Sequence, residues 1–159
     1  MTVLLTGGCA CENIRYECTE EPIVQLICHC RDCQRATGRA FAPAMFVAGD
    51  KFRYSKSTPS FHEVVGGSGR LVHRGFCGKC GGFISSHWPA NPHILIVSPI
   101  SLDDPSGFRP ATEIWLSHAQ PWHPVHPGTA KFEGPPLSGV KDKLDGYFAK
   151  RAGSRAATS

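Results

Sequence analysis

The sequence predicts a mainly β protein built from short antiparallel strands. Segments with alternating or β-branched residues recur along the chain and are separated by Gly, Pro, Ser and Asp, which is typical of strands joined by turns. The chain has 159 residues, of which 41% are hydrophobic, so it is large enough to form one soluble globular domain with its own core. The third observation is the presence of eight cysteines, more than an ordinary domain of this length needs.

The regular elements can be placed from local patterns. Residues 31–37 are predicted to form a helical turn that ends at Gly38, because glycine accepts the left-handed conformation found after helices. Residues 138–150 are predicted to form a second helix, since four apolar or aromatic residues recur there at helical spacing. Strands are expected at residues 2–6, 13–18, 22–28, 41–48, 61–65, 70–76, 83–87 and 93–98.

Two stretches near the C-terminus lack a regular pattern. Several of the 13 prolines fall between residues 121 and 136, which predicts an extended strap, because proline fixes φ and has no backbone N–H. Residues 151–159 offer little to bury, so we expect them to form a frayed tail.

No segment has the pattern of a membrane span or a secretory signal. The longest aliphatic run, residues 94–97, is far shorter than the about 18 apolar residues of a membrane helix. The first residues lack the basic and apolar regions of a signal peptide. We therefore expect a cytoplasmic protein with no membrane partner.

Seven of the cysteines lie in three tight groups with the spacing of metal-binding knuckles. Two thiolates separated by one or two residues can reach one zinc ion from a single turn of the chain. Glycines flank the first and third groups and let the backbone N–H groups turn toward the sulfur atoms. The groups are Cys9 and Cys11, then Cys28, Cys30 and Cys33, then Cys77 and Cys80.

Seven ligands cannot complete two closed zinc sites of four ligands each, so one site should be incomplete. The natural partition joins the first and third groups into a closed four-cysteine cluster, whose metal-binding energy contributes to folding. The middle group, the three-cysteine cluster, then holds a second zinc with one open coordination position. A thiol that binds there loses its proton, so this site is predicted to activate thiols.

The cysteines also allow other interpretations. Disulfides are one, although the expected compartment is reducing and bridges between such near neighbours would be strained. The three-cysteine cluster could instead be a second structural site completed by His29, His73 or an aspartate. Cys18 follows Ile14 and Tyr16 at a spacing of two, which favours a small apolar side chain on a strand, and we assign it no function.

The charge balance gives little support for nucleic-acid binding. The formal charge is +4, but seven thiolates and two Zn²⁺ ions would bring it to about +1. The basic residues are scattered and show no aromatic-basic signature, so no nucleic-acid partner is expected.

Three arginines recur every four residues beside the three-cysteine cluster and would share one face of the predicted helical turn. They form either a solvated surface stripe or a set of cations, one or two of which steer a small carboxylate-bearing thiol toward the zinc. These residues are Arg31, Arg35 and Arg39.

Four sequence motifs together resemble those of the glutathione-dependent formaldehyde-activating enzymes, a family grouped with centromere protein V. The resemblance extends from about residue 5 to about residue 132, in the family's order and with similar spacing. The motifs are GGCAC at residues 7–11, CHCRDCQRATG at 28–38, FCGKCG at 76–81 and SLDDP at 101–105.

The resemblance implies a fold of small twisted antiparallel sheets around zinc knuckles, with two zinc ions per chain. The structural zinc is then held by the four-cysteine cluster and the catalytic zinc by Cys28, Cys30 and Cys33. The implied activity is that of a carbon–sulfur lyase, the joining of glutathione and formaldehyde to S-hydroxymethylglutathione. On this basis residues 1–133 form the zinc-binding domain, and residues 134–159 form a C-terminal extension with a short helix and a frayed tail.

Two other classes of function fit the same cysteines. The chain could be a non-catalytic zinc scaffold that binds another protein, or a sensor of thiols or metals. Trp88, Trp115 and Trp122 could line a substrate pocket, but a buried aromatic residue more often belongs to a core.

Overall fold

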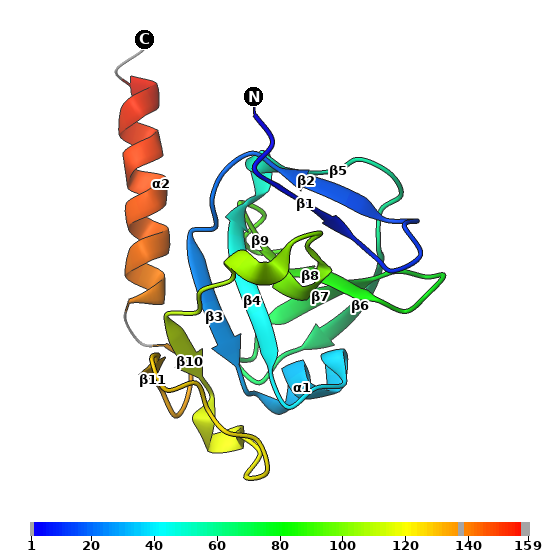
Figure 1. The fold of residues 1–159 in the computed structure, drawn as a ribbon. Helices are drawn as coiled ribbons and strands as arrows, with labels where there is room; N and C mark the ends of the chain where they lie inside the picture. The colour runs from blue at the N-terminus through cyan, green and yellow to red at the C-terminus, as the bar shows by residue number, and fades with distance from the viewer. Residues whose placement is uncertain (1, 137–138, 157–159) are drawn as a thin grey trace.

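The computed structural model describes residues 2–136 and 139–156, which form two β-sheets and two α-helices (Figure 1). The smaller sheet is antiparallel, in the order β1–β2–β5, and contains β1 (Leu5–Gly8), β2 (Arg15–Cys18) and β5 (Phe52–Tyr54). The larger sheet has eight strands in the order β11–β10–β3–β4–β9–β8–β7–β6. Its strands are β3 (Val24–Cys28), β4 (Ala42–Ala48), β6 (Ser60–Val65), β7 (Leu71–Phe76), β8 (Phe83–His87), β9 (Ile94–Val97), β10 (Thr112–Ile114) and β11 (Ala130–Lys131).

The prediction of a mainly β fold is confirmed, and each of the eight predicted strands overlaps an observed one, although the first begins three residues later than predicted, at Leu5. Three short strands were not predicted: β5, β10 and β11. The larger sheet is also not wholly antiparallel, because β10 runs parallel to both β3 and β11. Such short segments become strands because neighbouring strands offer them hydrogen bonds, so their own sequence carries little signal.

Both predicted helices are present. The first, α1 (Arg31–Thr37), ends as expected at Gly38, which has φ 66° and donates its N–H to the carbonyl of Gln34. The second, α2 (Val140–Ala156), continues past the predicted end at residue 150. Arg151 holds this last part through hydrogen bonds to Asp50 and Tyr147. The remainder of the predicted frayed tail, residues 157–159, lies outside the described residues.

The larger sheet separates two hydrophobic clusters, because successive residues of a strand face opposite sides. On β4, Met45 and Val47 pack against the smaller sheet, whereas Ala44 and Phe46 face the other side. The helix α2 lies on this second side next to β3 (Figure 1). Its first residue, Val140, is buried there. Short 3₁₀ turns and irregular segments connect the strands, and residues 121–129 contain no strand or helix. None of the described helices is both long enough and apolar enough to cross a bilayer.

Replacing Gly7 by alanine is expected to destabilise the packing of β1 against Tyr16 and the 3₁₀ turn Pro99–Ser101. A Cβ atom at this position would lie 2.4 Å from both the Ser101 carbonyl oxygen and the Tyr16 hydroxyl. We expect a loss of about 2 kcal/mol in the free energy of unfolding, the usual cost of overpacking, measured by urea denaturation. Gly107→Ala is the control, since no atom lies within 4 Å of its added Cβ. Equal stability of the two variants would contradict the close packing at Gly7.

Candidate metal centres and active-site cavity

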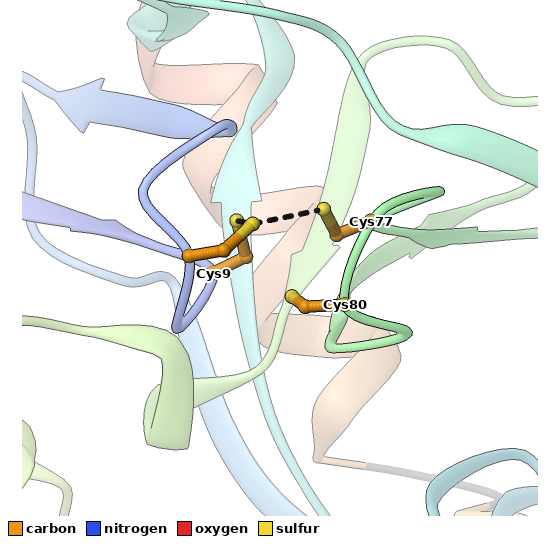
Figure 2. A group of neighbouring side chains, drawn as sticks. Cys9, Cys77 and Cys80 are labelled. Atoms are coloured by element: carbon orange, nitrogen blue, oxygen red, sulfur yellow. Dashed lines mark hydrogen bonds between the residues drawn. The ribbon is translucent and has the colours of Figure 1, made fainter.

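The four-cysteine cluster joins two turns that are distant in sequence. Cys9 and Cys11 lie between β1 and β2, and Cys77 and Cys80 lie in the turn between β7 and β8. Figure 2 shows Cys9, Cys77 and Cys80 side by side. The four sulfur atoms all lie within 4.8 Å of one another, with 3.5 Å from Cys9 to Cys11 and 3.7 Å from Cys11 to Cys77. A tetrahedral zinc with Zn–S bonds of about 2.3 Å requires sulfur separations of about 3.8 Å, so this donor set fits zinc.

Backbone groups prepare these sulfur atoms for a metal. The N–H of Ile14 donates to the sulfur of Cys9 at 3.2 Å, and the backbone N–H of Cys80 lowers the pKa of the Cys77 thiol. Gly81 has φ 72°, a conformation that closes the β7–β8 turn and favours glycine. The cluster therefore has the properties of a closed metal site that would hold the β1–β2 and β7–β8 turns together.

The three-cysteine cluster lies where β3 meets α1. Cys28 is the last residue of β3, Cys30 is the N-cap of α1, and Cys33 lies in the first turn of the helix. Their three sulfur atoms also lie within 4.8 Å of one another. Hydrogen bonds from Cys28 and Cys33 lower the pKa of the Cys30 thiol well below its usual range. Three convergent sulfur donors suit a soft ion such as zinc.

No fourth ligand completes this second cluster among the described residues. His29 turns its ring away, and its Nε2 lies 2.7 Å from Glu113. His73 lies beside Glu63 and His87, and Asp32 accepts a hydrogen bond from the N–H of Gly67 at 2.7 Å. The geometry therefore gives no support to the alternative of a second closed site completed by His29 or His73.

A cavity of about 320 Å³ opens beside the three-cysteine cluster, on the side of the larger sheet that faces away from the smaller one. Inward-facing residues of β3, β4 and β7–β10 form its floor, which includes Leu26, Phe46 and Ile96. Trp88 and Trp115 wall it, whereas Trp122 is 71% exposed and does not line it. Trp115 has φ 60°, an unusual conformation for a bulky residue, and stacks on the ring of His118, which also lines the cavity.

Only one of the three predicted arginines lines the cavity. Arg31 does so, and its guanidinium donates to the side-chain oxygen of Gln34. Arg35 and Arg39 are exposed and do not line it. The cavity contains instead a second arginine, Arg74 on β7, which is not among the three arginines predicted from the sequence. Its alternation with Val72 on a strand was the available signal, but that pattern does not say which face of the sheet holds the cavity.

Comparison with known proteins agrees with this arrangement. The model of the family described as glutathione-dependent formaldehyde-activating enzyme matches residues 4–118. The chain belongs to this family. Three chains of solved structures match the chain significantly, whereas no curated protein does. One, a crystal structure of a Rhodobacter sphaeroides protein, has 19% sequence identity and a TM-score of 0.50, covering 80% of this chain and 98% of that chain, and supports the fold alone.

A buried polar network supports the three-cysteine cluster of this formaldehyde-activating-enzyme family member. Glu113 on β10 is only 1% exposed and accepts hydrogen bonds from the Thr129 hydroxyl and the His126 N–H, each at 2.7 Å. Burial alone would raise the pKa of Glu113. The hydrogen bonds from His29, Thr129 and His126 outweigh this effect, so the pKa is lowered. Because His29 stands between Cys28 and Cys30, the network fixes the segment that carries both sulfur atoms.

Replacing Glu113 by alanine is expected to destabilise this protein by about 3 kcal/mol, because it leaves several buried donors unpaired. Urea denaturation would measure the loss. The pKa of Glu113 is lowered from its ordinary value of 4.5. The contribution of its carboxylate to the free energy of unfolding is therefore complete above pH 4.5 and is lost as the pH falls through the folded-state pKa. Glu63→Ala is the control, as that carboxylate is exposed, and it should cost about 0.5 kcal/mol. A similar small loss for both variants would mean that the network does not stabilise the fold.

Proposed function

We propose that this chain joins a small thiol, glutathione or a close relative, to formaldehyde and forms S-hydroxymethylglutathione. The observation that carries the proposal is the three-cysteine cluster, which lies in the wall of a substrate-sized cavity without a fourth ligand among the described residues. A closed metal site has no position for a substrate, whereas a site with three protein ligands has one. Membership in a family named for this chemistry supports the same conclusion.

In this proposal Cys28, Cys30 and Cys33 hold a zinc ion, and the four-cysteine cluster holds a structural one. The zinc of the three-cysteine site would supply an open position at which a substrate thiol loses its proton at neutral pH. This matters because a free alkyl thiol has a pKa of about 8.5, so only a small fraction of it is the nucleophilic thiolate at pH 7.

The chain's own residues position the reactants and exclude water. The apolar floor and Trp88 restrict the thiol and the aldehyde to a small volume, which raises their effective concentration. A sulfur–carbon bond forms, the carbonyl π bond becomes a lone pair on oxygen, and the proton released by the thiol is finally taken up by that oxygen. We assign this proton transfer to His118, the histidine that lines the cavity.

The test is the rate of exchange between free formaldehyde and S-hydroxymethylglutathione, measured by magnetisation-transfer NMR on protein with a known zinc content. We expect the zinc-loaded protein to accelerate this exchange above its spontaneous rate, in proportion to the enzyme concentration. Protein stripped of metal and then reloaded with zinc controls for a contaminant. A folded protein with both sites loaded and no acceleration would overturn the proposal.

A further inference from the structure

Two arginines and one carboxylate lie among the described residues that line the cavity beside the three-cysteine cluster. The arginines are Arg74 and Arg31, and the carboxylate is that of Asp32, which keeps its charge while it accepts a hydrogen bond from the N–H of Gly67. Within residues 2–136 and 139–156, no carboxylate lies within ion-pair distance of Arg74. In this described part of the chain, Arg74 thus lines the cavity without a carboxylate partner, which a ligand with a carboxylate would supply.

Arg74 is held in place by its strand. It lies in the interior of β7, paired with His62 on β6 and Ser86 on β8, so its backbone is fixed on both sides. Its side chain is partly buried, and a guanidinium removed from water without a counter-ion is unfavourable. Arg31 differs, because it is more exposed and its guanidinium already binds Gln34. Arg70 is not a lining residue, and its guanidinium carbon lies 5.9 Å from the centre of the Trp88 ring.

We propose that Arg74 binds a carboxylate of the thiol substrate and that the site therefore selects thiols with a carboxylate over neutral thiols. This inference rests on the proposed function, and it adds the residue that recognises the substrate. A guanidinium can donate two parallel hydrogen bonds to one carboxylate, so it fixes the orientation of the substrate as well as its charge. The carboxylate would lie over β7 while the sulfur reaches the three-cysteine cluster across the cavity.

A second role for Arg74 has to be separated from this one. Three thiolates around one Zn²⁺ carry a net charge of about −1, which Arg74 could simply compensate. The charge of Arg74 does act on the cluster, since it adds to the effect of Cys28 and Cys33 in lowering the pKa of Cys30. A counter-ion would support metal binding and affect every thiol equally, whereas a carboxylate-binding residue distinguishes one thiol from another.

The experiment compares two thiols of equal chain length, 3-mercaptopropionate and 3-mercapto-1-propanol, by isothermal titration calorimetry on the zinc-loaded full chain. We expect the wild-type protein to bind the carboxylate thiol at least about tenfold more tightly, as for a charge-assisted hydrogen bond. Arg74→Gln should remove this preference by weakening the carboxylate thiol alone, and Arg74→Lys should retain part of it. Arg35→Gln is the matched control, because Arg35 does not line the cavity, and it should leave both affinities unchanged.

The outcomes separate the inference from its alternatives. Equal binding of the two thiols by the wild-type protein would overturn it, and so would an Arg74→Gln variant that loses zinc or weakens both thiols alike. Zinc content and circular dichroism of each variant show whether it is loaded and folded. If the carboxylate thiol is selected but formaldehyde exchange is not accelerated, the inference stands and the proposed function fails. If exchange is accelerated but the carboxylate thiol is not selected, the proposed function stands and the inference fails.

Discussion

Replacing Cys77 by serine is expected to unfold the chain or leave it barely stable. The side chain of Cys77 is fully buried, and its cluster joins turns that are 66 residues apart. Structural zinc binding contributes roughly 10–16 kcal/mol in small zinc domains, which equals or exceeds the total stability of about 5–15 kcal/mol of most proteins. A serine hydroxyl is a poor zinc ligand, so the substitution should remove most of this energy together with the clip between the two turns.

The measurement is urea denaturation together with the zinc content of the purified variant. Cys18→Ser provides a matched control, because Cys18 is also buried but belongs to neither cluster. Its thiol donates to the carbonyl of Glu20 at 3.3 Å, a bond that a serine hydroxyl can keep, so we expect a loss of about 1 kcal/mol. A Cys77→Ser protein with the stability and zinc content of the wild type would show that the four-cysteine cluster is not a structural metal site.

Features carried by short sequence patterns could be predicted. The cysteine groups depend only on ligands a few residues apart, and the partition into four and three follows from counting them. The helix α1 and its end at Gly38 also follow from local rules, since the glycine that ends the helix directly follows its last residue in the sequence. The two clusters of sulfur atoms in the structure are the same two sets that the partition of the cysteines predicts.

Features that depend on strand pairing could not be predicted. Arg74 is one of 17 basic residues, and it reaches the cavity because the register of β7 turns it to that face. Glu113 meets His29 across 84 residues, on a strand of three residues that runs parallel to its neighbours. The length of α2 also depends on a distant contact, that of Arg151 with Asp50. In each case the deciding partner lies far away in sequence, where no local pattern identifies it.

Replacing Cys30 by serine is expected to abolish the proposed activity and to leave the fold intact. Cys30 is the N-cap of α1, and its sulfur accepts the N–H of Cys33 at 3.4 Å. Serine is a favourable N-cap residue, so α1 should persist, and we expect a stability loss below about 2 kcal/mol. The three-cysteine cluster, however, would retain only two thiolates, too few to hold zinc firmly.

Three measurements on one Cys30→Ser preparation distinguish the roles of the two clusters. The zinc content should fall from two ions to one per chain, the formaldehyde exchange rate should fall to its spontaneous value, and the urea midpoint should stay near that of the wild type. Collapse of both Cys30→Ser and Cys77→Ser would mean that both clusters are structural. Full exchange activity in a Cys30→Ser protein that has lost one zinc would place the chemistry outside the three-cysteine cluster. Because serine keeps the helix cap and removes only the thiolate, loss of activity in a folded variant reports on the metal ligand itself.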